Sequence, residues 1–69
     1  MLQLFMVRQT MSLEAVDHPD YHQRVAEAKQ GAEYDWWDSY TYSETALFVR
    51  QEDAQRCEDQ LKNIAQELQ

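Results

Sequence analysis

The strongest constraint on the fold is an apolar stripe near the C-terminus. Apolar residues recur there at spacings of three and four: Ala54, Cys57, Leu61, Ile64 and Leu68. That spacing places them on one side of an α-helix. Glu52 and Asp53 suit the N-terminal end of such a helix, where the helix dipole favours negative charge. The stripe covers only about two heptads, too few for a free-standing coiled coil, so we expect this helix to pack against a small domain.

A second helix is predicted over residues 18–30. Asp17 or His18 can serve as its N-cap, and Pro19 suits the first helical position, where its missing N–H costs nothing. Gly31 offers a left-handed stop at the C-terminal end. The preceding segment, Gln9 to Asp17, is either a loop or a short helical turn that begins at Ser12.

Two stretches of the chain favour strands. Leu2 to Arg8 is apolar at both odd and even positions, a pattern typical of a strand covered on both faces, although periodicity alone does not exclude a helix. Residues 34–50 read as two further strands, because aromatic and polar side chains alternate from Tyr34 and Thr45 to Val49 is a second β-prone run. Trp37 and Asp38 interrupt the alternation and indicate a bulge or a bend there. The turn between the two strands should fall near Ser43 and Glu44.

The expected element order is therefore β-α-β-β-α. The simplest assembly is an α+β fold, in which a small, largely antiparallel β-sheet carries two helices packed on one face. At 69 residues the chain has room for one domain only, residues 1–69, with a thin core. The order of the strands in the sheet is left open.

Charge restricts the class of partner. Thirteen acidic residues against six basic ones give a formal net charge of −7. We expect no direct binding to nucleic acid or to an anionic membrane, because both would repel the chain. A protein partner with a basic surface would attract it. The single cysteine cannot form an internal disulfide, and no secretory signal is visible, so the predicted location is the cytoplasm, or the host cytoplasm if the gene is viral.

Residues that could carry catalysis or bind a metal do not converge in the sequence. His18 and His22 are four apart and could share one face of a helix, but a usable metal site needs three or four ligands. Cys57 lies on the apolar stripe, where a free cysteine is usually a buried, inert side chain. We therefore expect no metal, no cofactor and no enzymatic activity.

The segment that suggests a function is both aromatic and acidic. No lysine or arginine occurs between Lys29 and Arg50. Exposed aromatic side chains flanked by carboxylates make good interface anchors, because the rings supply most of the binding energy and the charges set the register. The predicted partner-binding residues are Glu33, Tyr34, Asp35, Trp36, Trp37, Asp38, Tyr40, Tyr42 and Glu44. The competing interpretation is that the aromatic residues simply form the core of a thin sheet.

Trp36 and Trp37 are consecutive and would point to opposite faces of a strand, so we expect one of them to face away from the core or the chain to bend there. The hypothesis is a small acidic protein-interaction module that binds, and inhibits, a partner by occupying a basic, nucleic-acid-binding surface. Small acidic inhibitors of restriction or CRISPR effectors act in this general way, an analogy of charge and size alone. The alternative is a structural or assembly subunit that acts as a homodimer, because a sheet of three strands leaves exposed edges.

Overall fold

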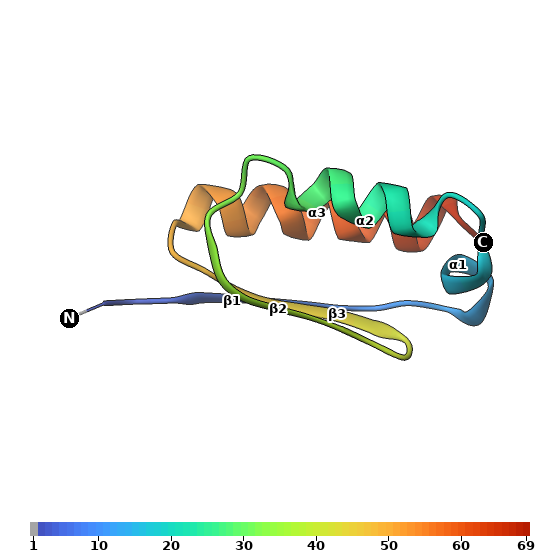
Figure 1. The fold of residues 1–69 in the computed structure, drawn as a ribbon, viewed down its shortest axis with the longest axis horizontal. Coiled ribbons are helices and arrows are strands. Elements are labelled where there is room, and N and C mark those ends of the chain that lie inside the picture. Colours follow the sequence, from blue (N-terminus) through green and yellow to red (C-terminus); the bar gives the residue numbers. More distant parts are fainter. Residues whose placement is uncertain (1) are drawn as a thin grey trace.

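The computed structural model describes residues 2–69 and has an α+β architecture, as predicted. In chain order, its elements are β1 (Phe5–Thr10), α1 (Leu13–Asp17), α2 (Tyr21–Lys29), β2 (Tyr34–Tyr40), β3 (Ser43–Phe48) and α3 (Gln51–Glu67). The short α1 makes the order β-α-α-β-β-α. The antiparallel sheet carries α2 and α3 together on one of its faces (Figure 1).

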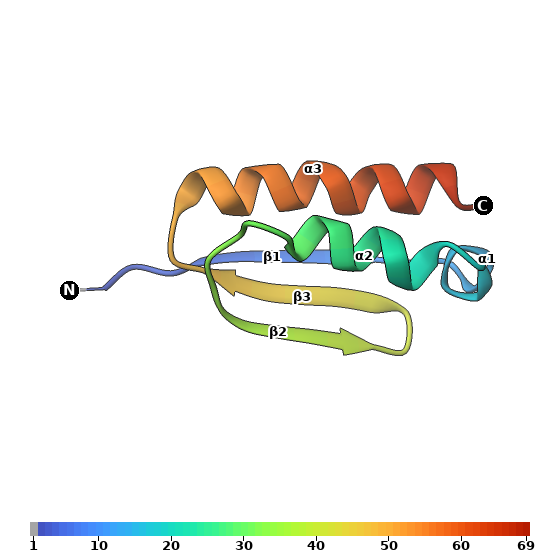
Figure 2. The ribbon, with the colours of Figure 1, turned by 45° about the horizontal axis from the view of Figure 1, so that its top comes forward.

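The sheet has the strand order β1-β3-β2, and both outer strands pair antiparallel with β3. β1 and β2 therefore run in the same direction on either side of β3 (Figure 2). α3 packs over β1 and β3, and α2 packs beside α3. The register aligns Val7 of β1 and Trp37 of β2 with Ala46 of β3.

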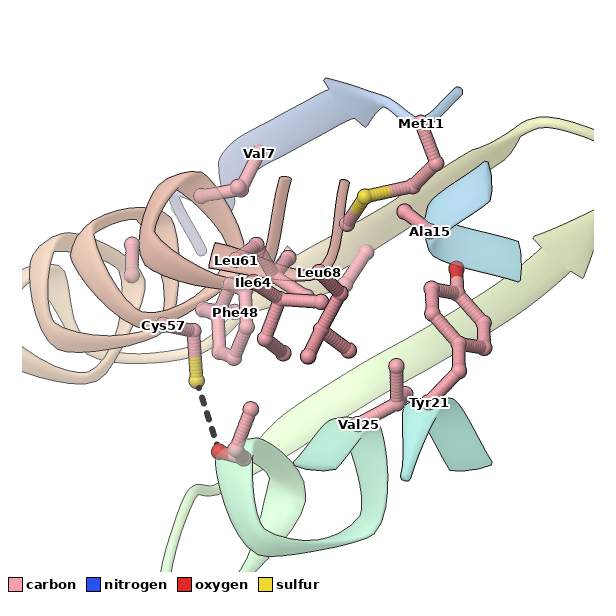
Figure 3. Packing of buried hydrophobic residues seen from close by; sticks show 13 residues of the cluster. Val7, Met11, Ala15, Tyr21, Val25, Phe48, Cys57, Leu61, Ile64 and Leu68 are labelled. Atoms are coloured by element: carbon pink, nitrogen blue, oxygen red, sulfur yellow. Dashed lines mark hydrogen bonds between the residues drawn. The ribbon is translucent and has the colours of Figure 1, made fainter. Parts of the chain in front are cut away.

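The core lies between the helices and the sheet. All five residues of the predicted apolar stripe are buried, which confirms α3 and the direction of its packing. They meet Val7, Ala46 and Phe48 from the sheet and Tyr21, Val25 and Ala28 from α2 (Figure 3). Full burial of one large apolar side chain contributes about 1.5–3 kcal/mol, so a few such residues supply most of the stability of this domain.

The C-terminal end of α2 agrees with the prediction, but its N-terminal end does not. Gly31 adopts a φ of 77°, the left-handed stop that was expected. The start is wrong by three residues: Asp20 is the N-cap, and Pro19 precedes the helix. His18 is instead the C-cap of α1, with its N–H bonded to the carbonyl of Ala15. The helical turn at Ser12 is confirmed, because the Ser12 hydroxyl accepts a hydrogen bond from the Ala15 N–H at 3.1 Å.

The hairpin between β2 and β3 is confirmed, but its turn and bulge lie elsewhere. The turn falls at Thr41 and Tyr42, two residues before the predicted position. The bulge lies between Tyr34 and Trp36. This arrangement places Glu44 within β3 and opposite Ser39, where donors from other elements reach its carboxylate. These side-chain contacts fix the hairpin register, which no Asn-Gly or Asp-Gly turn signal specifies.

The prediction that the first strand is covered on both faces is wrong. Val7 is buried beneath α3, but its neighbour Met6 is 68% exposed. The helices form one layer, and that layer covers only one face of the sheet (Figure 1).

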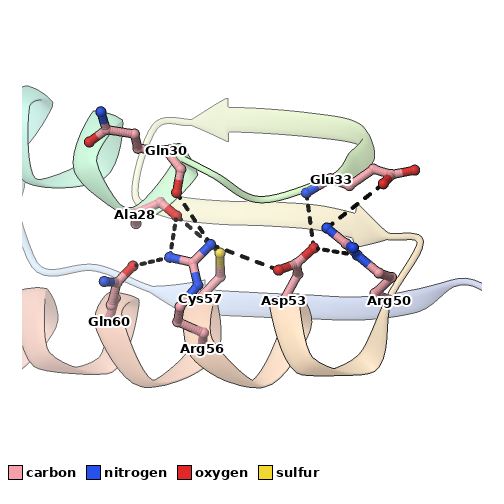
Figure 4. A network of polar contacts seen from close by, with 8 residues as sticks. All are labelled: Ala28, Gln30, Glu33, Arg50, Asp53, Arg56, Cys57 and Gln60. Carbon is pink, nitrogen blue, oxygen red and sulfur yellow. Dashed lines mark hydrogen bonds and ion pairs between the residues drawn. The ribbon is translucent and has the colours of Figure 1, made fainter.

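A polar network joins the start of α3 to the start of β2 and the end of α2 (Figure 4). The Asp53 carboxylate accepts hydrogen bonds from the Glu33 backbone N–H at 3.0 Å and from Arg50 Nε at 3.2 Å. The first of these bonds, together with the nearby arginines, lowers the pKa of Asp53 below its ordinary value. Arg56 donates to the backbone carbonyls of Ala28 and Gln30.

Helices long and apolar enough to cross a bilayer do not occur within residues 2–69.

Candidate interaction site

The face of the sheet turned away from the helices is open to solvent, and we call it the outer face. Its side chains come from alternate positions of the three strands: Met6, Arg8, Thr10, Trp36, Asp38, Tyr40, Ser43, Thr45 and Leu47. The register groups them in three rows across the strands. One row is apolar (Met6, Leu47, Trp36), the next contains Arg8, Thr45 and Asp38, and the last contains Thr10, Ser43 and Tyr40.

The bulge in β2 decides which tryptophan faces outward. Because one extra residue lies between Tyr34 and Trp36, Tyr34 faces the helices and Trp36 pairs with Leu47 on the outer face. Trp36 is 46% exposed. The expectation that one indole turns away from the core is confirmed.

Trp37 belongs to the inner side. It is partly buried against the core, and its ring makes an edge-to-face contact with Phe48 at a centroid distance of 5.9 Å. Tyr34 packs edge-on against the same indole at 5.4 Å. Lys29 Nζ lies 4.9 Å from the centroid of the ring, a cation–π contact that covers it from α2. The Trp37 ring therefore packs within the fold and is not part of the outer face.

Glu44 is the centre of a buried polar cluster. Only 1% of the residue is exposed. Its carboxylate accepts hydrogen bonds from the Tyr21 hydroxyl (2.7 Å), Trp37 Nε1 (2.8 Å) and the Ser39 hydroxyl (2.6 Å). Burial and the adjacent Glu44 carboxylate raise the pKa of the Tyr21 phenol well above its ordinary value. The cluster ties α2 to both strands of the hairpin.

A groove of about 490 Å³ lies between α2 and the end of the β2–β3 hairpin. Glu44 and Tyr21 contribute to its lining, with His22, Lys29 and Tyr40 among the other residues. The carboxylate there is held by the hydrogen bonds of the cluster, so its role is to join the elements around it. The Ser39 hydroxyl in this lining donates its hydrogen bond to Glu44.

The structure places the nine predicted binding residues in different environments. Trp36, Asp38 and Tyr40 lie on the outer face. Tyr34, Trp37 and Glu44 lie on the helix side of the sheet. The others lie at its margins: Glu33 before β2, Asp35 in the bulge and Tyr42 in the turn.

The acidic residues of the segment are not gathered on one surface. Glu44 is buried, and the Glu33 carboxylate lies 3.8 Å from Arg50 Nη2. The strand pairing places Asp38 on the outer face, in the same row as Arg8, and leaves the exposed Asp35 in the bulge without a partner on β3. The paired rows of the outer face are therefore mainly aromatic and apolar, with Arg8 and Asp38 as their charged residues.

The outer face also contains residues of the other two strands, which were not among the predicted binding residues. Met6 and Leu47 complete the apolar row with Trp36, and Arg8 and Thr45 complete the next row with Asp38. A signal was present: two long helices can cover only one face of a sheet, so alternate residues of Leu2 to Arg8 had to remain exposed.

The histidine pair and Cys57 are the residues that the sequence offered for metal binding and for nucleophilic chemistry. In the part of the chain that the structure describes, no group of three or more His, Cys, Asp or Glu residues could hold a metal ion. His18 instead accepts a hydrogen bond at Nδ1 from the Asp20 N–H at 3.0 Å. Cys57 is buried, and its Sγ lies 3.1 Å from the Ala28 carbonyl oxygen, to which it donates. Burial raises the pKa of the Cys57 thiol, which opposes formation of a reactive thiolate.

Comparison of the chain with protein-family models, curated proteins and solved structures gave no match. Functional inference therefore depends on the geometry of the molecule itself.

Proposed function

We propose that this chain is a protein-binding module that docks the outer face of its sheet onto another polypeptide. The observation that carries the proposal is the apolar row formed by Met6, Leu47 and Trp36. The helices leave this row uncovered, with Met6 68% and Trp36 46% exposed. Removing such a row from water is favourable, and a contiguous apolar patch on a small domain marks an interaction site more often than a single exposed side chain does.

The residue types suit a binding surface. Tryptophan, tyrosine and methionine are enriched at the centres of protein interfaces, and tryptophan is among the residues whose truncation costs the most binding energy. Trp36 and Tyr40 project from a hydrogen-bonded strand, so the backbone that carries them is already ordered before binding. Binding to such a surface loses less conformational entropy than binding to a loop.

The net charge of −7 attracts basic partners and repels a second copy at long range, so docking of the outer face depends on its short-range contacts and not on the net charge. Inhibition of a nucleic-acid-binding partner stays a prediction, because the acids that suggested it are separated by the fold. The apolar row, and not a row of carboxylates, supports the binding proposal.

The test compares two serine substitutions of exposed apolar residues. Trp36→Ser removes the anchor of the outer face, whereas Leu13→Ser removes an exposed apolar side chain on α1. Each variant and the wild type are immobilised, and the proteins that they retain from a lysate of the source cells are quantified by mass spectrometry. We expect Trp36→Ser to lose a partner that Leu13→Ser keeps. Equal retention by both variants would contradict the proposal, provided that circular dichroism shows both to be folded.

A further inference from the structure

We propose that the polypeptide that docks on the outer face is a second copy of this chain, related to the first by a two-fold axis that runs close to β3. This inference rests on the proposed function and names its partner. Two observations carry it: the distribution of charge on the outer face and the position of β3 between two strands of the same direction.

The paired rows of the outer face carry few charges for a strongly negative molecule. Arg8 and Asp38 are the charged residues among the nine side chains that the strand pairing places there, although the chain carries −7 and the exposed Asp35 lies in the bulge beside them. Neither residue takes part in an ion pair within residues 2–69. A partner that supplies one acid and one base at matching positions would pair both.

A second copy supplies those charges in the required places. Arg8 and Asp38 both pair with Thr45, one from each side, so they lie in one row on opposite edges of the sheet. A rotation of 180° about an axis parallel to β3 exchanges the two edges. It therefore brings Arg8 of each copy over Asp38 of the other, and two equivalent ion pairs form.

The same rotation matches the apolar row. Met6 of each copy meets Trp36 of the other, a sulfur–aromatic contact that is favourable in itself. Leu47 and Thr45 lie on the central strand, near the axis, and face their own counterparts. Sheets that pack face to face are about 10 Å apart, a spacing that side chains of this size fill.

Two directions are possible for a two-fold axis in the plane of the face, parallel or perpendicular to the strands, and charge favours the parallel one. A two-fold axis perpendicular to the strands, passing through the Arg8–Asp38 row, would place Arg8 against Arg8 and Asp38 against Asp38. Like charges in apposition at an interface are strongly unfavourable. The axis along β3 replaces both repulsions with attractions.

The size of the face sets the expected affinity. Six residues of strand span about 20 Å, and three strands span about 10 Å between their axes, so the contact lies at the small end of protein interfaces. We expect a reversible dimer with a dissociation constant on the order of tens of micromolar.

The experiment is sedimentation equilibrium on the full chain, from about 1 µM to about 1 mM, a range chosen to span affinities of weak interfaces. Arg8→Asp leaves two acids on the outer face, and Asp38→Arg leaves two bases. We expect each variant alone to dimerise at least about tenfold more weakly than the wild type, because both charge contacts become repulsive. An equimolar mixture of the two variants should recover the association, since each acid then faces a base.

Lys62→Asp on α3 is the control for net charge, because it changes the charge of the chain by the same amount as Arg8→Asp does at an exposed position on the helix side. It should dimerise like the wild type. A mixture of Arg8→Asp and Asp38→Arg that stays monomeric would overturn the proposed pairing. A dimer that Arg8→Asp and Asp38→Arg do not weaken, or that survives Trp36→Ser, would overturn it in favour of another surface such as a sheet edge.

Failure of this inference is distinguishable from failure of the proposed function. If the wild type is monomeric over the whole range, the second copy is excluded. The proposed function nevertheless stands if Trp36→Ser loses a captured partner that Leu13→Ser retains. If both variants retain the same proteins and the wild type is monomeric, both proposals are wrong.

Discussion

The two faces of the sheet share the same strands but differ in almost every physical respect. On the inner face, Ala46 and Phe48 are sealed beneath the helices, and the carboxylate of Glu44 is enclosed by hydrogen-bond donors. On the outer face, Met6 and Trp36 are open to water. Because α2 and α3 lie together on one face, the apolar residues on that face become core and those on the other face remain exposed to solvent.

Trp36 and Trp37 show this difference between adjacent residues. Trp37 donates a hydrogen bond to Glu44 and packs on Phe48, whereas Trp36 stands in a row with Leu47 on the other side. One indole packs against the core, and the neighbouring one is partly exposed to solvent.

The largest effect is expected for Phe48, which is fully buried on the inner face. Phe48→Ala should cost about 3–5 kcal/mol, since it removes a core ring and leaves a cavity. That cost is comparable to the whole stability of a domain this small, so the variant should be largely unfolded by circular dichroism. The neighbouring Leu47→Ala, on the outer face, should remain folded at dilute concentration. Similar losses in both variants would contradict the assignment of the two faces.

Glu44 should have the next largest effect. Glu44→Leu leaves the donors of Tyr21, Trp37 and Ser39 without their acceptor and should lower the free energy of unfolding by on the order of 3 kcal/mol. Glu44→Gln should be much milder, because its amide oxygen can still accept and the Tyr21 hydroxyl can rotate to accept from the new amide N–H. Urea denaturation measures both. Equal destabilisation by the two substitutions would show that the hydrogen bonds are not what makes Glu44 important.

Substitutions of the two tryptophans should have the third largest effect on the free energy of unfolding. Trp37→Ala should cost about 2 kcal/mol, because it removes a half-buried ring and its hydrogen bond to Glu44. Trp36→Ala should change stability by less than about 0.5 kcal/mol, since its ring lies on the open face. Thermal denaturation of dilute samples compares them, and the reverse order would mean that the inward and outward positions have been exchanged.

A smaller effect than that of Trp37→Ala is a pH dependence that originates at Tyr21. Because the folded pKa of this phenol is raised above its ordinary value of 10.0, the folded chain keeps the proton that the unfolded chain releases. The stabilisation is complete below pH 10 and decreases as the pH rises further. Tyr21→Phe should cost about 1 kcal/mol at pH 8, and its deficit relative to the wild type should shrink above pH 10. A deficit that stays constant up to pH 11 in urea denaturation would contradict the raised pKa.

The sequence was sufficient for features that depend on local periodicity. The apolar stripe of α3 and the left-handed stop at Gly31 are encoded by nearby residues, and both were predicted; of the two alternatives left open before α2, the helical turn at Ser12 is the one found. The position of the hairpin turn was not, because Thr41 and Tyr42 carry no turn signal. The register instead depends on contacts between Glu44 and distant elements, including Tyr21, which lies 23 residues earlier.

The candidate site could be predicted only in part for the same reason. The aromatic segment revealed Trp36, Asp38 and Tyr40, which lie on one strand. Met6 and Arg8 join them through a strand that begins about 30 residues earlier in the chain, and no local pattern indicates that pairing. The bulge between Tyr34 and Trp36 then reversed the faces of the residues beyond it, which moved Trp37 into the fold.

The most direct test of the difference between the two faces is the NMR signal of the two indole N–H groups during dilution. The Trp36 resonance should shift between about 1 mM and about 10 µM, the range over which a weak interface dissociates, because its ring passes from the contact with the second copy to water. The Trp37 resonance should remain fixed, since its N–H is bonded to Glu44 at 2.8 Å in either state. A Trp36 signal that does not move, or a Trp37 signal that moves instead, would contradict the proposed role of the outer face.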